Sequence, residues 1–298
     1  MGFDRPGDAD LPRDGRQAEV GDVRAEPRGR EEYYADQQAA VSAWGESAVR
    51  FRGLWAEYQR RWPAEEHPPV DRSGDPPGSW RGEGNRFLDR PVNEEVDAAC
   101  AQVTTREQDR FSPALREVEG RDPDRHLVGF EDRLKGRDRI KEKVADAIEE
   151  KGLTPKEAIS LVPDAIRYTF QYHETSYTQG VRADVGRMTD QGFQLVELRN
   201  SWSDDQYKGI NSRWADPGTG QRCELQFHTQ ISFEAKQFTH RAYQQLRSGQ
   251  ADEFEEMVLE TFQRKVSAAV PVPPGAIEIP DYPERGPDAG HGHLLRDR

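Results

Sequence analysis

The sequence predicts an α/β protein of the α+β kind, in which helices cover a mixed sheet. In residues 164–172, DAIRYTFQY, large apolar side chains alternate with other residues, which is typical of a strand. A helical pattern follows, and three more alternating segments then come at 193–200, 207–214 and 223–229. One helix between the first two strands allows these strands to run parallel, whereas the turn residues ADPGTGQR between the last two favour an antiparallel hairpin.

The predicted helices show apolar residues at spacings of three and four. They cover 93–121 (as one or two helices), 137–152, 177–192, 231–247 and 255–266. In the second of these, Ile140, Val144 and Ile148 share one face and Gly152 marks the end. We therefore expect each helix to pack its apolar face on the sheet or on a neighbouring helix.

Composition divides the chain into five parts. The formal net charge is -13, hydrophobic residues make up 34% and the mean hydropathy is -0.98, which is too polar for one compact domain over the whole length. We expect residues 1–30 to be disordered, 63–91 to be a Pro/Gly-rich linker and 92–270 to be the folded domain. The Pro- and Gly-rich tail 271–298 is expected to wrap the domain as extended chain before it frays.

An amphipathic helix is predicted over residues 31–62. Its apolar stripe carries Trp44, Phe51, Trp55, Tyr58 and Trp62 at helical spacing. Such a stripe favours docking on the domain of the same chain. Self-association or the binding of a neutralising protein through 31–62 stays an open alternative.

Several classes of protein are disfavoured. The acidic balance argues against a broad nucleic-acid-binding surface, and two cysteines cannot form a disulfide framework or a paired metal motif. We find no secretory signal and no apolar run long enough to span a membrane, so we expect a soluble protein without a membrane partner. It is cytoplasmic by default, with a secreted or delivered form left open.

Two acidic residues mark the strands that are chemically informative. Asp164 opens the first strand, and Glu224 lies in the fourth, CELQFHT, where Glu224, Gln226 and His228 share one face. If these strands are neighbours, the two carboxylates converge, and Mg²⁺ is often bound by one or two carboxylates together with substrate phosphates. The alternative is a pair of half-exposed acids at strand ends with no metal.

A basic run precedes the first strand. The segment RLKGRDRIKEK contains Arg133, Lys135, Arg137, Arg139, Lys141 and Lys143. Arginine and lysine bind phosphate groups well, and a helix that begins after Gly136 offers free backbone N–H groups to an anion. A solvated helix face is the alternative interpretation.

Five segments in this order resemble the synthetase domain of the RelA/SpoT family over roughly residues 93–268. They are RLKGRDRIKEK, DAIRYTF, YKGINSRW, CELQFHT and FEAKQFTHRAYQQLR. The resemblance implies a nucleotidyltransferase-like sheet and an activity that moves the pyrophosphate of ATP onto the 3′-hydroxyl of a nucleotide. It implies that ATP contacts Arg133, Lys135, Arg137, Lys141 and Arg167. It also implies that Asp164 and Glu224 hold Mg²⁺, with Gln226 as a third catalytic residue.

The acceptor half of the motifs departs from the family pattern. Ile210 stands where the family has a tyrosine that stacks on guanine, Trp214 stands for its histidine, and His228 for its arginine. The predicted acceptor-binding residues are Tyr207, Lys208, Asn211, Ser212, Trp214 and His228. We expect Tyr207 or Trp214 to supply the aromatic plane and a protonated His228 to contact phosphate.

The sequence therefore predicts a magnesium-dependent ATP:nucleotide 3′-pyrophosphokinase, with an adenine nucleotide as the favoured acceptor. One alternative is a toxin of the same fold that pyrophosphorylates tRNA or depletes ATP. A second alternative is an inactive nucleotide-binding relative.

Overall fold

A computed structural model describes residues 30–63, 70–84, 86–160, 162 and 164–283. The chain forms two compact units, residues 1–40 and 41–298, and the account below concerns the second. The predicted disordered segment 1–30 (apart from Arg30) and the end of the tail lie outside the described residues.

The second unit contains a five-stranded mixed sheet with the strand order β3-β4-β7-β6-β5. The strands are β3 (Arg125–Val128), β4 (Arg167–Tyr172), β5 (Gln194–Asn200), β6 (Ile210–Ala215) and β7 (Arg222–Thr229). Strands β4 and β7 are parallel neighbours, and the other neighbouring pairs are antiparallel. The predicted mixed sheet is confirmed, and β4 and β5 point the same way, although they are not neighbours.

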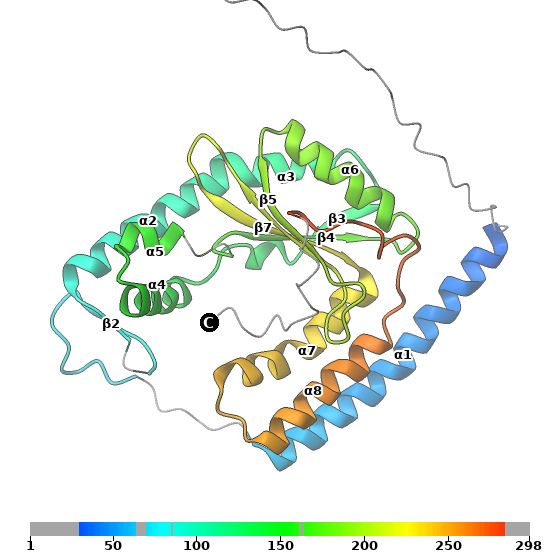
Figure 1. Ribbon diagram of the computed structural model, residues 1–298, viewed down its shortest axis with the longest axis horizontal. Coiled ribbons are helices and arrows are strands. Elements are labelled where there is room, and N and C mark those ends of the chain that lie inside the picture. The colour runs from blue at the N-terminus through cyan, green and yellow to red at the C-terminus, as the bar shows by residue number, and fades with distance from the viewer. Residues whose placement is uncertain (1–29, 64–69, 85, 161, 163, 284–298) are drawn as a thin grey trace, which may run out of the picture. The chain divides into compact units, whose positions relative to one another are not determined.

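Helices cover both faces of this sheet (Figure 1). They are α2 (Arg90–Arg106), α3 (Ser112–Glu119), α4 (Arg137–Lys151), α5 (Pro155–Ser160), α6 (Tyr177–Asp190), α7 (Gln230–Ser248) and α8 (Glu253–Ala268). A π-helical turn (Glu107–Phe111) joins α2 to α3, and a 3₁₀ turn (Phe130–Asp132) precedes α4. The face that carries Leu225 and Phe227 is fully buried, and Tyr177 of α6 donates a hydrogen bond to the Phe227 carbonyl. Helix α7 lies over the opposite face, where Lys236 reaches Gln226.

The part of helix α1 (Arg30–Arg61) that belongs to the second unit packs along α7 and α8 (Figure 1). The indole of Trp44 donates a hydrogen bond to Glu234 (2.7 Å), and Tyr58 donates to Glu255 (2.5 Å). Phe51 is buried and meets Phe262 edge to face. The aromatic stripe therefore packs on the same chain, as the favoured interpretation expects.

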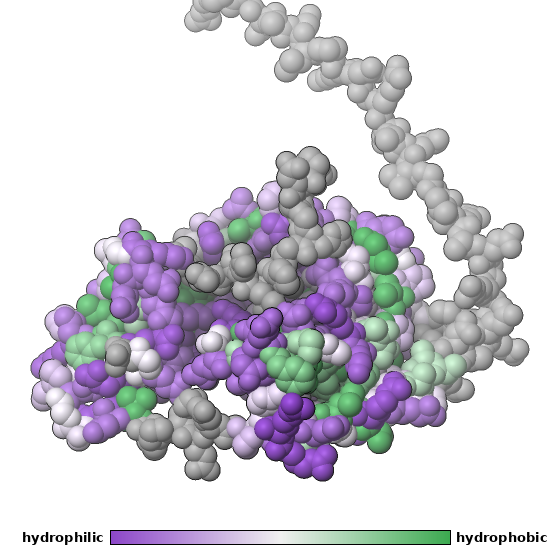
Figure 2. Space-filling view, turned by 60° about the horizontal axis from the view of Figure 1, so that its bottom comes forward, coloured by the Kyte–Doolittle hydropathy of each residue, from purple (hydrophilic) through white to green (hydrophobic). Residues whose placement is uncertain are grey.

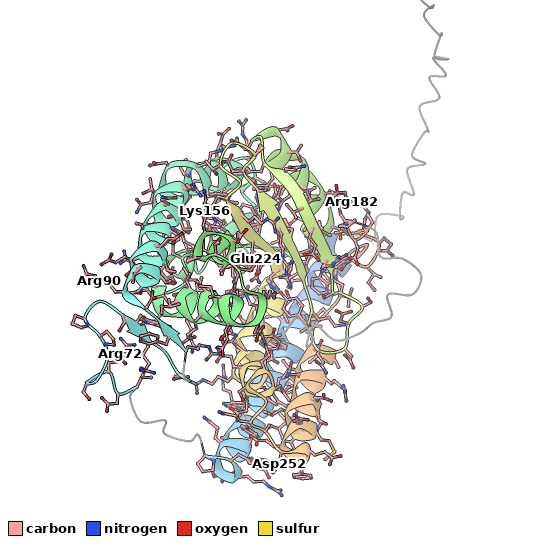
Figure 3. The ribbon with its side chains drawn as sticks, turned by 60° about the vertical axis from the view of Figure 1, so that its left-hand side comes forward. Arg72, Arg90, Lys156, Arg182, Glu224 and Asp252 are labelled. Carbon is pink, nitrogen blue, oxygen red and sulfur yellow. The ribbon has the colours of Figure 1, made fainter. Side chains whose placement is uncertain are left out.

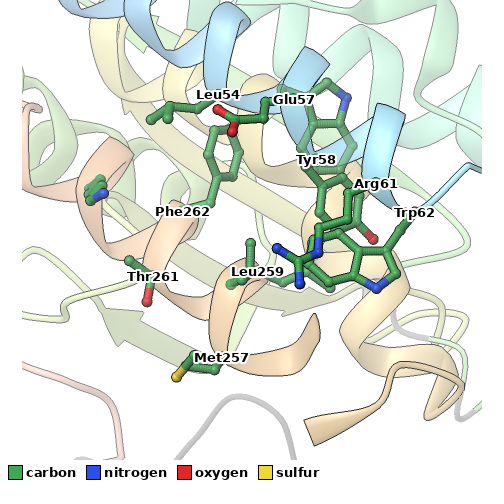
Figure 4. A pocket seen from close by; sticks show the side chains of 12 residues that line it. Leu54, Glu57, Tyr58, Arg61, Trp62, Met257, Leu259, Thr261 and Phe262 are labelled. Carbon is green, nitrogen blue, oxygen red and sulfur yellow. The ribbon is translucent and has the colours of Figure 1, made fainter. Parts of the chain in front are cut away.

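A pocket of about 340 Å³ lies between α1 and α8 (Figure 4). Its aromatic wall is a row of rings from Trp55, Tyr58 and Trp62, stacked on one another, and Phe262 and Met257 of α8 line the other side. The residues that the sequence predicts for the functional site do not line this pocket.

The predicted linker 63–91 differs from expectation where the structure describes it. Strands β1 (Trp80–Arg81) and β2 (Phe87–Leu88) pair in a small antiparallel sheet, and Trp80 is buried with its indole donating to Asp138 of α4 (2.8 Å). The abundance of Pro and Gly in this segment conceals two apolar side chains, Trp80 and Leu88, which pack in the core. Residues 80–88, as far as they are described, thus form a packed hairpin, and Arg90 already begins α2.

The described part of the tail, 271–283, lies against the edge strand β5. Tyr282 exchanges backbone hydrogen bonds with Leu198 (2.7 and 2.9 Å), and Asn200 donates to the carbonyls of Ala276 and Ile279. The described part of the tail thus lies against the domain, but residues 274–279 form turns instead of the expected extended chain. Among the helices that the structure describes, none combines the length and apolar character needed to cross a membrane.

Candidate active site

The parallel pairing of β4 and β7 brings the two predicted acids together. Arg167 at the start of β4 is in register with Glu224 of β7, and Asp164 lies just before β4. The Nη2 of Arg167 donates to Oδ2 of Asp164 (2.9 Å), and its Nε lies 3.1 Å from Oε1 of Glu224. The two carboxylates therefore converge on one guanidinium group, and Figure 3 shows Glu224 on the sheet.

Three cations surround the carboxylate of Asp164. Lys135 lies 2.7 Å from Oδ2, Lys143 lies 3.0 Å from Oδ1, and Arg167 completes the set. Burial alone would raise the pKa of Asp164, but the charges and hydrogen bonds of the two lysines outweigh it and hold this pKa well below its usual value. Asp164 is therefore ionised at neutral pH.

Backbone pairing fixes Lys135 beside this acid. The amide of Lys135 donates to the Ala165 carbonyl (3.0 Å), and the amide of Arg167 donates to the Arg133 carbonyl (2.7 Å). The segment before α4 is thereby held against the start of β4. Lys143 approaches from the second turn of α4, which begins after Gly136.

A second set of polar groups continues from Glu224 along β7. Gln226 donates from Nε2 to Oε1 of Glu224 (2.5 Å), and its Oε1 accepts hydrogen bonds from Lys236 of α7 and from Thr169 of β4 (3.3 Å). Asp164, Arg167, Glu224, Gln226 and Lys236 thus form one connected network, which we call the charged network.

His228 is on the same sheet face but is fully buried. Its Nε2 pairs with the Tyr207 hydroxyl (2.8 Å) and its Nδ1 with the Ser232 hydroxyl (2.9 Å), while Tyr207 donates to Asn211 (3.0 Å). Burial lowers the pKa of His228 well below its usual value. The prediction of a protonated His228 on phosphate is therefore wrong, because the neutral ring positions Tyr207 instead.

Gly209 allows this packing. Its φ is +151°, and a Cβ there would lie 2.6 Å from the His228 ring. The glycine that precedes β6 is thus needed because the backbone passes directly over the imidazole.

Ser212 and Trp214 do not reach the site. Both are fully buried, on the sheet face opposite Glu224, where Trp214 donates to the Ser212 hydroxyl (2.8 Å) and Ser212 donates to the Leu225 carbonyl (2.8 Å). The prediction that they contact the acceptor is wrong for a simple reason. Strand residues alternate between faces, so Asn211, which is paired with Gln226, faces the site and its neighbour does not.

The predicted ATP-binding residues divide into two groups. Lys135 and Arg167 belong to the charged network or contact it, whereas Arg133 pairs with the buried Glu107 (2.8 Å) and Lys141 pairs with Asp97 of α2 (2.8 Å). Arg137 is exposed at the start of α4. Lys208 donates to the backbone carbonyls of Trp202 and Asp204 and therefore anchors its own loop.

Comparison with known proteins gives matches among solved structures alone. No family model and no curated protein matches this sequence. Small alarmone synthetase 1 from Bacillus subtilis aligns with 60% of this chain and 86% of its own length, at 17% identity and a TM-score of 0.38. A GTP pyrophosphokinase family protein from Streptococcus pneumoniae aligns with 60% and 85%, at 15% identity and a TM-score of 0.36. The chain is similar in structure to small alarmone synthetases.

A further solved structure is similar to the same extent. It is the Bacillus subtilis small alarmone synthetase bound to its product pppGpp, which has 16% identity and a TM-score of 0.36. All three resemblances concern the arrangement of the chain, so the chemistry of this protein is argued from its own side chains.

Lys143 and Lys236 are functional candidates that the sequence did not select. Lys143 is part of the basic run, and helical geometry could have distinguished it, because Lys141 lies between the buried Ile140 and Val144. Lys236 interrupts an otherwise apolar helix face, next to the buried Ala235 and Thr239. A lysine among buried neighbours at the centre of a helix is the signal that was available.

The donor chemistry of the two acids fits a magnesium ion. Asp164 and Glu224 offer carboxylate oxygens that converge on the Arg167 guanidinium, and Mg²⁺ needs only one or two carboxylates when phosphates supply other ligands. Within the described ranges, no group of three or more His, Cys, Asp and Glu residues forms a cage for a metal ion. A bound Mg²⁺ would therefore depend on the substrate for part of its coordination.

Proposed function

We propose that this chain transfers the pyrophosphate group of ATP to the 3′-hydroxyl of an acceptor nucleotide, releasing AMP. The observation that carries the proposal is the convergence of Asp164 and Glu224 on Arg167, beside Lys135 and Lys143. An acceptor that is an adenine nucleotide would give products of the (p)ppApp type.

The cations of this cluster suit a triphosphate. Lys135, Lys143 and Arg167 carry three positive charges against the two negative charges of Asp164 and Glu224, so positive charge is in excess there. Phosphate oxygens can take over these contacts, and fixed cations then stabilise the charge that develops during phosphoryl transfer. Lys135 and Arg167 are thus the predicted ATP-binding residues that the proposal retains, and Lys143 joins them.

The proposed reaction is an in-line displacement at the β-phosphorus. The acceptor 3′-oxygen forms a bond to the β-phosphorus, while the bond from this phosphorus to the oxygen that bridges the α- and β-phosphates breaks. AMP leaves with the bonding electrons, and the hydroxyl proton passes to Glu224. Oε1 of Glu224 already contacts Gln226 and Arg167, so Oε2 is the oxygen available as the base.

The metal that this proposal includes is Mg²⁺. Asp164 and Glu224 would hold it, and the ion would supply positive charge that offsets the charge of the ATP phosphates. Arg167 lies between the two acids, so it would exchange its contact with Oε1 of Glu224 for a phosphate when substrates bind, which leaves Oε1 for the metal and Oε2 for the acceptor hydroxyl.

The residues proposed to bind the acceptor are Tyr207 and Asn211. Tyr207 is held by hydrogen bonds to Asn211 and His228, and it supplies the aromatic plane because Trp214 is buried on the other sheet face. Ile210 is also fully buried, so the ring on which guanine stacks in the RelA/SpoT pattern has no counterpart at that position. The acceptor base therefore has to stack on another ring, and adenine is the base that we propose.

Labelled ATP distinguishes the candidate functions. The protein is incubated with Mg²⁺ and γ-labelled ATP, with AMP, ADP, ATP, GTP or tRNA as acceptor, and the products are separated by chromatography. We expect AMP release and a 3′-pyrophosphorylated adenine nucleotide. Label on tRNA would favour the toxin alternative, and absence of transfer to every acceptor would contradict the proposal.

Two variants are the controls for this assay. Asp164→Asn and Glu224→Gln keep the shape of each side chain but remove its charge, so both should lower transfer by about 10²-fold or more. Circular dichroism checks that each variant stays folded. Full activity in either variant would overturn the site assignment.

A further inference from the structure

Lys236 projects from α7 onto the polar face of the sheet. Its ammonium group donates a hydrogen bond to Oε1 of Gln226, which also accepts one from Thr169. Two donors therefore define the oxygen end of the Gln226 amide, and its NH₂ end is directed to the opposite side.

The NH₂ end of Gln226 donates to Oε1 of Glu224 at 2.5 Å. The Nε of Arg167 lies 3.1 Å from the same oxygen. Both contacts are to Oε1. Oε2 of Glu224 has no hydrogen-bond partner among the residues that the structure describes. The carboxylate is held by one oxygen and presents the other.

The environment of Lys236 is costly for a cation. Burial and the nearby charge of Arg167 lower its pKa to about 8, and Glu224 opposes this effect. A structural lysine would gain more from solvent or from a direct carboxylate partner, whereas Lys236 contacts a neutral amide. Its charge is thus placed to polarise and orient Gln226.

We propose that Lys236 is a positioning residue: it fixes the Gln226 amide so that Glu224 is held by Oε1 and directs Oε2 to the acceptor hydroxyl. This inference rests on the proposed function for its kinetic consequence. The orientation of Gln226 by Lys236 can be measured without any turnover.

Lys236→Met tests the proposal, because methionine keeps much of the length of the side chain without its charge. We expect kcat to fall by about 10- to 100-fold, since the base is no longer oriented, while KM for ATP changes by less than about threefold. Lys265→Met on α8 is the matched control, because Lys265 is exposed and lines only the pocket between α1 and α8, and it should leave both constants unchanged.

A double-mutant cycle identifies the path of the effect. If Lys236 acts through Gln226, then Gln226→Met and the double variant should lose about the same activity as Lys236→Met, instead of the product of two losses. Multiplicative losses would overturn the proposal. So would a higher KM for ATP at unchanged kcat, which would make Lys236 a phosphate-binding residue.

The side-chain amide resonances of Gln226 give a readout that does not need activity. In the unmodified protein we expect the chemical shifts of these resonances to differ from those of a free amide, and their protons to exchange slowly with water. In Lys236→Met we expect the chemical shifts to move towards the values of a free amide. If Lys236→Met leaves these resonances unchanged, the inference fails, whether or not the protein transfers pyrophosphate. If they move but the unmodified protein shows no transfer, only the proposed function fails.

Discussion

Arg167 has a central position at the scale of single residues. Among the residues that the structure describes, it is the one side chain that contacts both Asp164 and Glu224, and it relieves the repulsion that two converging carboxylates would otherwise experience. Burial would lower the pKa of Arg167, but Glu224 and Asp164 raise it. Arg167 therefore keeps its charge and holds the two acids ready for a shared cation or phosphate group.

The charge of Lys236 predicts how activity depends on pH. Its pKa is lowered from 10.5 to about 8, so the ammonium loses its proton as the pH rises through that value. The ionisable groups around it are Arg167, Glu224, His228 and His240. We expect kcat to decline above about pH 8, because a neutral amine orients Gln226 less strongly.

The pH profile of Lys236→Met is the comparison. This variant has no ammonium to titrate, so its lower kcat should not decline further above about pH 8. As the pH rises, the contribution of Lys236 to stability should change in the opposite direction to its contribution to activity. Because the folded state binds this proton less tightly than the unfolded chain, the contribution of Lys236 to the free energy of unfolding should rise between about pH 8 and 10.5. An alkaline decline that persists in Lys236→Met would assign it to another group.

The positions of site residues follow from the sequence where the residue type and the strand pattern agree. Asp164, Glu224 and Gln226 were predicted because they are chemically suited residues on recognisable strands, and their convergence needs only that β4 and β7 are neighbours. A motif alone does not show which sheet face a residue occupies. Ser212 and Trp214 match the motif, but they lie on the buried face, because adjacent strand residues face opposite sides. The burial of His228 depends on Tyr207 and Ser232, which no local pattern reveals.

At the scale of elements, α4 separates two lysines that the sequence treats alike. Lys143 reaches Asp164, whereas Lys141 is turned by about 200° around the helix and pairs with Asp97 of α2. The same short basic run therefore serves two purposes, one in the charged network and one in packing.

These two lysines form a matched pair of variants. Lys143→Met should raise KM for ATP by roughly 10- to 100-fold, because a charged hydrogen bond to phosphate contributes about 1.5–3 kcal/mol. Lys141→Met should leave KM unchanged and lower the free energy of unfolding, because Asp97 loses its partner. Steady-state kinetics and urea unfolding of both variants provide the measurement. The reverse pattern would show that the ATP site lies on the α2 side of α4.

The packing of α1 on α7 and α8 gives a second prediction for an element. Phe51 is 2% exposed and touches Trp44 and Phe262, so Phe51→Ala should lower the free energy of unfolding by about 3–5 kcal/mol. Val49, on the same helix, is 65% exposed, and Val49→Ala should change it by no more than about 0.5 kcal/mol. Equal effects in chemical unfolding would contradict the docking of α1.

At the scale of the whole second unit, the polar sheet face and the apolar sheet face have separate roles. The residues of the charged network lie on the face covered by α7, and the fully buried aromatic residues of β4 and β7 lie on the other. On the view in Figure 2, hydrophilic residues predominate and surround a hollow, with hydrophobic residues in smaller groups. A stable apolar layer can thus support a layer of charges that would be costly in isolation.

Long-range contacts account for most of what the sequence did not predict at this scale. Strand β3 is a short segment, RHLV, with two basic residues, so its alternation is too weak to be recognised. The hairpin of β1 and β2 and the segment 271–283 have the composition of linkers, and they are ordered only because α4 and β5 offer partners for Trp80 and Tyr282. Composition reports such segments as loops, since their partners lie far away in the chain.

The central claim is that the two acids and the cluster of cations form one nucleotide site. A crystal structure with Mg²⁺ and α,β-methylene-ATP, in which the bond that must break is replaced, tests this claim most directly. We expect the triphosphate against Lys135, Lys143 and Arg167, with the metal ion on Asp164 and Glu224. A nucleotide bound elsewhere, with the ion pairs of Asp164 unchanged, would contradict the account.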